Sequence, residues 1–247
     1  MIGPDFSMPN NFESPEATVG ISIIIPTFNE EKYIARLLGY LKEMTPQAEV
    51  IVADGGSTDA TREIASESGA VLVKCPQKGR AAQMNLGASF ANNKILYFVH
   101  ADTLPPGDFY NKIQRSVSKG FSLGRFRTKF DSKNPLLKLN AFLTRFDWYI
   151  CSGGDQTLFI TSKAFETVEG FKEELLLMED YDIVKRARQS FLYCIMNDNV
   201  LISARKYDNN SWLKVQMAHY RIIKMYQSGV QQKVLVEKYK KLLQYRY

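Results

Sequence analysis

A strand pattern that ends in two side chains able to bind a metal constrains this chain most. Ile95 to Val99 is a continuous apolar run with aromatic and β-branched members, which is typical of a strand buried on both faces of a parallel sheet. The run ends at His100 and Asp102, and a Pro-Pro-Gly sequence at 105–107 turns the chain away. Ligands of open α/β sheets bind beyond the carboxyl ends of the strands, so we expect an imidazole and a carboxylate at the mouth of the sheet. The alternative is a structural pair, in which Asp102 only caps the next turn.

The first hundred residues alternate between strand and helix patterns. Strands are predicted at 21–25, 49–53, 70–74 and 95–99. Helices are predicted between them, at 30–44, in a short segment that ends at Gly69, and at 81–88. Asn29 is the expected cap of the first helix. This order implies right-handed crossovers and an α/β domain with a mostly parallel central sheet flanked by helices.

The spacing changes after Thr103. The second half predicts, in order, a helix at 108–118, a strand at 122–131, a helix at 135–146, a strand at 157–161, a helix from Asp180, and two short strands at 193–196 and 200–203. The pattern at 212–247 predicts two basic amphipathic helices that are separated at Gly229. We therefore expect a poorly ordered lead-in at 1–18, a main domain at 19–206 and a C-terminal helical appendage at 207–247.

Composition favours an ordinary globular protein in a reducing compartment. A chain of 247 residues can bury its core without disulfides, and Cys75, Cys151 and Cys194 are too few and too far apart for a disulfide framework or a zinc site. No apolar run approaches the ~20 residues of a membrane-spanning helix. The N-terminus lacks the basic and apolar regions of a signal peptide, so the expected location is the cytoplasm.

The positive charge of the chain is concentrated in its last part. From Arg205 to Tyr247 there are ten Lys or Arg and two Asp or Glu, a net charge of +8. The whole chain carries +6, so the rest of it carries −2. This distribution argues against nucleic acid as a partner of the main domain and leaves an anionic surface as a partner of the tail.

The apolar residues of the tail fall on two helical stripes, at Val215, Ile222 and Tyr226 and at Leu235, Tyr239 and Leu242. Three interpretations remain open for these stripes. The helices pack on the main domain, they lie in the plane of the inner face of a membrane as a peripheral contact, or they form a homodimer interface.

Carboxylates follow the second and fourth predicted strands, at Asp54 and Asp102. Both would face one cleft, and their repulsion suggests a cation or ligand donors between them. Asp59 is expected only to cap a helix. Lys78 and Arg80 lie in a glycine-containing loop at a helix N-terminus, where backbone amides and the helix dipole favour phosphate. Taken alone, this segment is better explained as a solvated loop.

Several catalytic classes lack their motifs. The chain contains no Gly-x-x-x-x-Gly-Lys-Ser/Thr, no Gly-x-Gly-x-x-Gly and no Gly-x-Ser-x-Gly sequence, and two histidines do not favour a histidine-based hydrolase. Glu179 and Asp180 start a helix, where the dipole favours acids in any case. The functional interpretation is a carboxylate base close to the sheet mouth.

Four motifs in order resemble glycosyltransferase family 2, whose members are inverting enzymes of the GT-A fold. They are Ile-Ile-Pro-Thr-Phe-Asn-Glu-Glu (24–31), Val-Ala-Asp-Gly-Gly-Ser-Thr-Asp (52–59), His-Ala-Asp-Thr (100–103) and Met-Glu-Asp (178–180). The resemblance spans residues 20–205. The segments 78–85, 100–103, 154–156 and 203–206 also resemble a narrower bacterial branch, often called selenium/radical-SAM-associated transferases.

The resemblance implies a role for each matching residue. The donor would lie against Pro26, Thr27, Phe28, Glu30, Asp54, Lys78, Arg80, Ala101, Asp102 and Arg205. Among these, Asp54 would hold the base, and Asp102 would bind the metal and the diphosphate. Asp180 would be the catalytic base with Glu179 beside it. The sugar and the acceptor would border Gly154, Asp155 and Gln156.

One departure affects the metal. His100 stands where the family has the first acid of Asp-x-Asp, so the predicted metal ligands are Asp102 and His100. Imidazole is the softer donor and favours Mn²⁺ over Mg²⁺, or else metal dependence is weak. The Gln-x-x-Arg-Trp signature of processive synthases is absent, so we expect one sugar to be transferred per encounter.

The resemblance therefore implies an inverting, non-processive glycosyltransferase that uses a nucleotide-diphosphate sugar, an acceptor hydroxyl and a divalent cation. The position of Asp54 favours a UDP-sugar. Two other classes stay open. A sugar-nucleotide nucleotidyltransferase would normally carry a Gly-rich, basic signature where Pro26-Thr27-Phe28-Asn29 stands, and a catalytically silent nucleotide-binding module would tolerate the altered His-Ala-Asp sequence.

Overall fold

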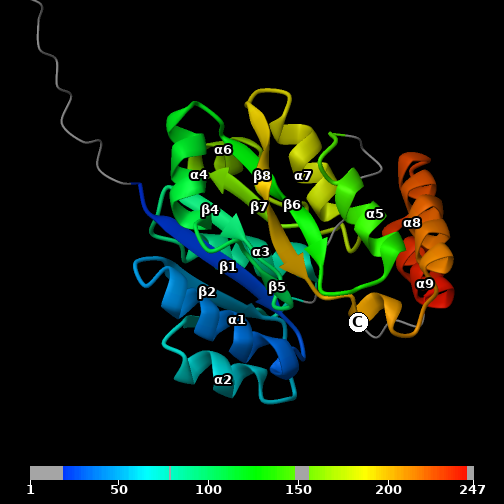
Figure 1. Cartoon of the computed structure of the whole chain (residues 1–247), viewed down its shortest axis with the longest axis horizontal. Helices are drawn as coiled ribbons and strands as arrows, with labels where there is room; N and C mark the ends of the chain where they lie inside the picture. Colours follow the sequence, from blue (N-terminus) through cyan, green and yellow to red (C-terminus); the bar gives the residue numbers. More distant parts are fainter. Residues whose placement is uncertain (1–18, 78, 148–155, 244–247) are drawn as a thin grey trace, which may run out of the picture.

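The computed structural model describes residues 19–77, 79–147 and 156–243. It contains one eight-stranded sheet with helices on both faces and a pair of helices at one side (Figure 1). The strand order is β3-β2-β1-β4-β7-β6-β8-β5.

The first half of the chain builds a parallel sheet. Its elements are β1 (Ile21–Thr27), α1 (Glu31–Met44), β2 (Glu49–Asp54), α2 (Thr61–Glu67), β3 (Val71–Lys74), α3 (Arg80–Ser89) and β4 (Ile95–Phe98). β1 pairs in parallel with β2 and β4, and β2 pairs in parallel with β3. The carboxyl ends of these four strands therefore meet at one edge, as the alternating pattern predicts.

The second half makes the sheet mixed. Its elements are β5 (Thr103–Leu104), α4 (Phe109–Ser118), β6 (Leu123–Phe130), α5 (Pro135–Leu143), β7 (Leu158–Thr161), α6 (Ser162–Thr167), α7 (Glu179–Ala187), β8 (Tyr193–Ile202), a 3₁₀ turn (Arg205–Tyr207), α8 (Trp212–Gln227) and α9 (Gln232–Leu242). β7 runs antiparallel to both β4 and β6, and β5 runs antiparallel to β8. The α/β class is confirmed, but only the first half of the sheet is wholly parallel.

Two short strands predicted at 193–196 and 200–203 form the single strand β8. The register of β8 against β6 jumps from Met196, opposite Phe126, to Asn199, opposite Arg127. Residues 197–198 are therefore a β-bulge. Their polar side chains resemble a turn in the sequence, which explains the wrong prediction of a break.

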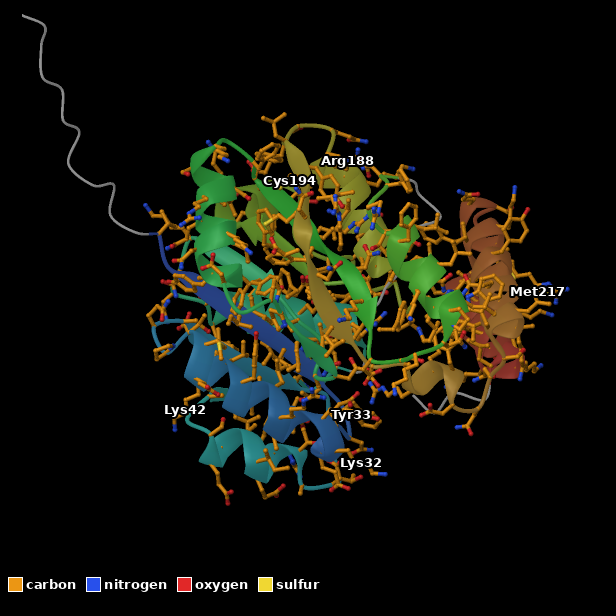
Figure 2. The ribbon with its side chains drawn as sticks, viewed as in Figure 1. Lys32, Tyr33, Lys42, Arg188, Cys194 and Met217 are labelled. Atoms are coloured by element: carbon orange, nitrogen blue, oxygen red, sulfur yellow. The ribbon has the colours of Figure 1, made fainter. Side chains whose placement is uncertain are left out.

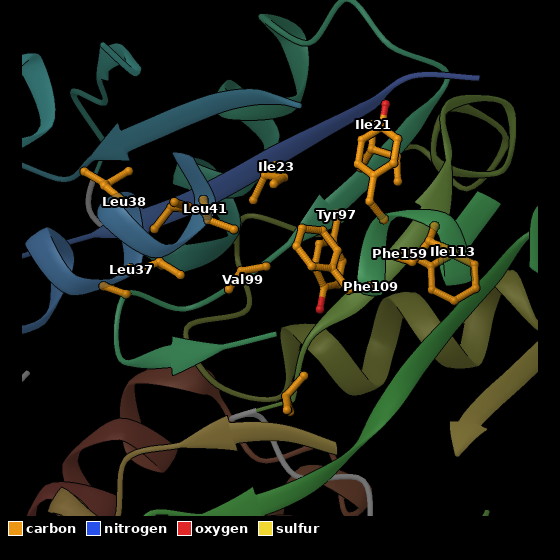
Figure 3. Packing of buried hydrophobic residues seen from close by; sticks show 14 of the residues in the cluster. Ile21, Ile23, Leu37, Leu38, Leu41, Tyr97, Val99, Phe109, Ile113 and Phe159 are labelled. Atoms are coloured by element: carbon orange, nitrogen blue, oxygen red, sulfur yellow. The ribbon is translucent and has the colours of Figure 1, made fainter. Parts of the chain in front are cut away.

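The core lies on both faces of the sheet. Along β1 and β4, alternate residues enter different clusters: Ile23 and Tyr97 contact the α1 and α4 side, whereas Ile24 and Phe98 contact the α3, α6 and α7 side. Figure 3 shows the first cluster, in which Tyr97 packs 5.3 Å from the ring of Phe109. The expected burial of the 95–99 strand on both faces is confirmed.

The predicted cap of α1 is wrong. Asn29 has a φ of 56°, and its side chain accepts a hydrogen bond from the amide of Thr58 at 2.8 Å, so it joins two loops. The N-cap position falls on Glu30, which makes no side-chain capping bond.

The two tail helices pack on each other and on the loop before α7. Their predicted apolar stripes lie in one cluster around the buried side chains of Val215, Leu235 and Tyr239, which also contains Leu177 of that loop. Packing is therefore the role of these stripes. The chain turns between the helices at Gly229, whose φ is 73°.

No helix in the described ranges is long and apolar enough to cross a membrane. Cys75 and Cys194 are free thiols, and Cys151 lies outside the described residues.

Candidate functional site

The carboxyl edge of the parallel strands is built around Asp54, which is 1% exposed. One carboxylate oxygen of Asp54 accepts bonds from the amides of Gly56 and Ser57, at 3.1 and 3.0 Å. The other accepts bonds from the hydroxyls of Ser57 and Thr27. Asp54 thus holds the turn after β2 in place and joins it to β1.

Asp59 ties the next turn to α1. Its carboxylate accepts bonds from the amides of Thr61, at 3.0 Å, and Glu31, at 3.2 Å. Burial acts to raise the pKa of Asp59, but the hydrogen bonds from Thr61 and Glu31 outweigh it and hold this pKa below its usual value. Asp59 therefore has a structural role beside the helix start, close to the expected one.

Arg205 joins the end of β1 to the end of β4. Its guanidinium donates two bonds to the Glu30 carboxylate, at 2.7 and 2.8 Å, and its Nε lies 2.8 Å from Asp102 Oδ2. The guanidinium also stacks over the ring of Tyr33, 4.7 Å from the centroid. Asp54 and Asp102 therefore have separate partners: amides and hydroxyls for Asp54, a guanidinium for Asp102.

Other residues predicted to contact the donor lie close to the Arg205–Glu30–Asp102 ion pairs. Phe28 follows β1 with 42% of its surface exposed, whereas Pro26 and Thr27 are buried in the strand. Ala101 packs into the core at 4% exposure, so its side chain faces away from the mouth. Tyr33 lies near the start of α1 (Figure 2) and is half-buried.

His100 and Asp102, at the end of β4, are the side chains that could contribute to a cation shared with a ligand. In the described part of the chain, no three His, Cys, Asp or Glu side chains converge as a metal site. His100 is half-buried at the turn after β4, with its carbonyl accepting from the amide of Thr103 at 3.0 Å. An aspartate and an imidazole are acceptable ligands of Mn²⁺, and nucleotide-bound cations need only one or two protein ligands when phosphates supply the rest.

Helix α3 attaches the predicted base to the sheet. Arg80, at the first position of α3, lies 2.6 Å from the carboxylate of Glu179 at the start of α7. Asn85 pairs with the backbone of Phe171 through two hydrogen bonds, at 2.8 and 2.9 Å. Gln83 donates to the carbonyls of Thr27 and Ala53, at the ends of β1 and β2. One helix thereby fixes the loop before α7 relative to the carboxyl ends of β1 and β2.

The tail also contacts this loop. The side-chain oxygen of Gln232, at the start of α9, accepts bonds from the amides of Leu176 and Leu177 at 3.1 and 3.0 Å. Trp212 of α8 donates to Asn140 of α5 at 3.2 Å. The appendage therefore supports the segment that precedes Glu179 and Asp180.

Asp180 and Gln156 line the same cavity, which has a volume of about 280 Å³ and lies between α7, β6 and β7. The predicted base and one predicted acceptor residue are thus brought together. Lys78, Gly154 and Asp155 lie outside the described residues.

Sequence reasoning missed Gln83, Asn85, Gln232 and Arg125. Polar residues on an apolar helix face were the available signal for the first two, because a buried amide needs partners. Gln232 and Arg125 carry no such local signal, since their partners are distant in sequence.

Breaking the Arg80–Glu179 pair should destabilise the fold, because Glu179 is 1% exposed and would be left as a buried charge. We expect Arg80→Met to lower the free energy of unfolding in urea by about 2–3 kcal/mol, since Arg80 is itself one-third exposed. The Arg80→Met/Glu179→Gln double variant should recover most of that loss. As a control, Lys112→Met breaks a more exposed pair with Asp198 and should cost about 1 kcal/mol or less. Equal destabilisation by the single and double variants would contradict this account.

Comparisons with known proteins agree with the fold. A family model described as Glycosyl transferase family 2 matches residues 22–171. A 4,4'-diaponeurosporenoate glycosyltransferase of Staphylococcus haemolyticus is 39% identical over 94 residues, which cover 35% of this chain and 25% of that protein. The chain thus spans only about a quarter of that relative.

Solved structures resemble the chain at low identity and show its fold. A mannosyltransferase of Pyrobaculum calidifontis in complex with GDP-Man and Mn²⁺ matches with a TM-score of 0.66 and 18% identity, over 86% of this chain and 65% of that one. Glucosyl-3-phosphoglycerate synthase of Mycobacterium tuberculosis, in complex with Mn²⁺, uridine diphosphate and glucosyl-3-phosphoglycerate, matches with a TM-score of 0.55 and 17% identity, over 86% and 81%. The architecture is the GT-A fold, and because the family match covers more than half of the sequence, the chain belongs to glycosyl transferase family 2.

Proposed function

We propose that the protein transfers one sugar from a nucleotide-diphosphate sugar to an acceptor hydroxyl, with inversion at the anomeric carbon. One observation carries this proposal: the Asp102–Arg205–Glu30 link and the cavity beside Asp180 are both held at the carboxyl edge of the parallel strands. Ligands of open α/β sheets bind at this edge. The family membership and the similar proteins favour this reaction over the nucleotidyltransferase alternative.

The nucleoside would lie over the ends of β1 and β2. Phe28 offers an exposed ring for stacking on a base. Asp54 already accepts four hydrogen bonds from protein groups, so we propose that it serves the base by shaping the turn at Gly55–Ser57 and not by a direct contact. We propose a uridine nucleotide as the donor, on the position of Asp54 in the family resemblance. The two similar structures described above contain GDP-Man and uridine diphosphate, respectively.

The diphosphate would lie against Asp102, Arg205 and Arg80. Arg205 carries a positive charge at the end of β4, and Arg80 another at the start of α3, where the helix dipole also favours an anion. Lys78 precedes this helix in sequence. We propose that Asp102 and His100 hold a divalent cation together with the diphosphate, and such a cation stabilises the charge of the leaving group. Both structural neighbours described above contain Mn²⁺.

Asp180 would act as the general base. The acceptor oxygen forms a bond to the anomeric carbon, the bond from that carbon to the diphosphate breaks with its electron pair leaving on the diphosphate, and the hydroxyl proton passes to the Asp180 carboxylate. Glu179, fixed by Arg80, would hold the start of α7 in position. Gly154, Asp155 and Gln156 would border the sugar and the acceptor.

The narrower bacterial branch rests on the segments at 78–85, 100–103, 154–156 and 203–206 and stays a prediction. So does the division into a lead-in at 1–18, a catalytic domain at 19–206 and a tail at 207–247. The contacts of Gln232 with Leu176 and Leu177 favour a tail that supports the catalytic loop.

Nucleotide binding should be strengthened by a cation. With UDP at a hundred times its Kd, we expect about 2.7 kcal/mol of stabilisation against unfolding, and Mn²⁺ should increase the affinity. Mn²⁺ alone should bind weakly, because the protein supplies only two ligands. Asp102→Asn should remove the cation-dependent part, measured by titration calorimetry. If the parent protein binds no nucleoside diphosphate, the proposed function is wrong.

Replacing the base should reduce turnover but not donor binding. We expect Asp180→Asn to lower the transfer rate by ~10² to 10⁴ with a nearly unchanged Kd for UDP, because the base acts on the acceptor. The control, Asp198→Asn in the exposed bulge of β8, should keep the parent rate. A near-parent rate for Asp180→Asn would move the role to Glu179 or Asp155.

We also propose that α8 contacts an anionic membrane surface in its plane. The side of α8 opposite the packed stripe exposes Leu213, Met217 and Tyr220, at 61%, 49% and 52%, and Lys224 lies over the Tyr220 ring. Met217 lies at the outer edge of the molecule (Figure 2). Exposed apolar residues at helical spacing on a segment with a net charge of +8 complement anionic headgroups.

Vesicle co-sedimentation separates this contact from the alternatives. The parent should bind anionic vesicles, with an attraction of about 1 kcal/mol from each Lys or Arg at the surface, and this binding should weaken as salt rises. It should not bind neutral vesicles. Met217→Glu should reduce binding, whereas Val71→Glu, at an exposed position on β3, should not. Absent binding would contradict the membrane contact, and a concentration-dependent dimer lost in Met217→Glu would assign this face to a homodimer.

A further inference from the structure

The cavity beside Asp180 contains a cluster of cationic side chains. Of its lining residues, Arg125 comes from β6, and Lys185 and Arg188 come from the same helix as Asp180. Uncharged polar groups are added by Gln156, Thr157, Tyr181 and Tyr193. The volume, about 280 Å³, is at the small end of ligand sites, so it suits a short molecule or the end of a longer one.

Arg125 is a buried cation. It is 4% exposed, and its guanidinium donates to the carbonyls of Thr144 and Phe146, at 2.8 and 3.3 Å. Its Nε is buried and makes no hydrogen bond. Among the ion pairs formed by residues 19–77, 79–147 and 156–243, none includes Arg125. Neutral carbonyls orient the guanidinium but, within the described ranges, no acidic side chain forms an ion pair with it.

The other charges around the cavity do not balance Arg125. Asp147 forms a two-bond pair with Arg188, at 2.6 and 2.8 Å, and this pair is neutral. Lys185 is exposed at the rim, so among the described lining residues two cations, Arg125 and Lys185, remain beside one carboxylate, Asp180. Burial raises the pKa of Tyr193 although Arg125 and Arg188 act to lower it, so its hydroxyl keeps its proton at neutral pH.

A buried, unpaired guanidinium is costly, and arginine is rarely buried without an anionic partner. A bound carboxylate or phosphate would supply the missing counter-charge, because the guanidinium binds both through planar, charge-assisted hydrogen bonds. We propose that the Arg125 cavity is the acceptor subsite and that the acceptor carries an anionic group, a carboxylate or a phosphate, near the reacting hydroxyl. This inference rests on the proposed function, because it assigns the cavity to the acceptor of that reaction.

The structural alternative is that Arg125 only ties the end of α5 to β6. Both roles predict destabilisation when Arg125 is removed, so stability does not separate them. Anion affinity does, because a structural tie has no effect on a ligand once the protein is folded.

The test uses three compounds on one carbon skeleton: glycerol 3-phosphate, glycerate and the neutral glycerol. Each is titrated calorimetrically into full-length protein saturated with UDP and Mn²⁺, so that the donor edge is filled. We expect one or both anionic compounds to bind and glycerol not to bind, and the tighter of the two identifies phosphate or carboxylate. Glycerol binding as tightly as the anions, or loss of anion binding on adding UDP, would overturn the inference.

Variants locate the binding. Arg125→Gln should weaken the affinity for the anionic compound by about 10- to 100-fold and leave the Kd for UDP unchanged. Arg125→Lys should weaken this affinity less, since the lysine keeps the positive charge. If Arg125→Gln does not fold, Lys185→Gln at the exposed rim should still weaken the affinity for the anionic compound severalfold. Lys119→Gln, just after α4, should leave that affinity unchanged. A folded Arg125→Gln protein with parent anion affinity would contradict the proposal. If the parent binds no UDP, the proposed function fails separately, and the same anion titration without UDP still tests the cavity.

Discussion

Helix α3 is the constraint on which the rest of the site depends. Its Gln83 amide bonds the ends of β1 and β2, its Asn85 holds the backbone of Phe171, and its Arg80 pairs with Glu179. A helix that is packed against the sheet thus sets the distance between the carboxyl edge of β1 and β2 and the start of α7. Catalytic groups need such rigid support, because small displacements cost large factors in rate.

Charge at the mouth of the sheet is distributed through two arginines that come from distant parts of the chain. Arg205, just after β8, pairs with both Glu30 and Asp102, and Arg80 pairs with Glu179. These ion pairs hold the three acidic side chains in place. The same guanidinium groups lie where a diphosphate would need positive charge, so the packing and the proposed chemistry use the same residues.

The sequence allowed the parallel half of the sheet to be predicted because local patterns determine it. Ile95 to Val99 is apolar throughout, and alternate residues enter different core clusters. The antiparallel half was harder, since the pairing of β6 with β7 and β8 depends on contacts between segments far apart in sequence. The positions of Asp54, Asp102 and Asp180 at strand or helix ends followed from pattern and resemblance. The burial of Arg125 and the Gln232 contact did not, because only tertiary structure places their partners beside them.

The central claim is that the carboxyl edge of β1, β2 and β4 binds a nucleoside diphosphate next to the cavity that holds Asp180. A crystal structure of the protein with UDP and Mn²⁺ tests it most directly, with anomalous scattering to locate manganese. The account predicts a manganese peak in contact with the Asp102 carboxylate and the diphosphate, with the uridine over the end of β1 beside Phe28. A nucleotide bound elsewhere, or a manganese peak away from Asp102, would contradict it.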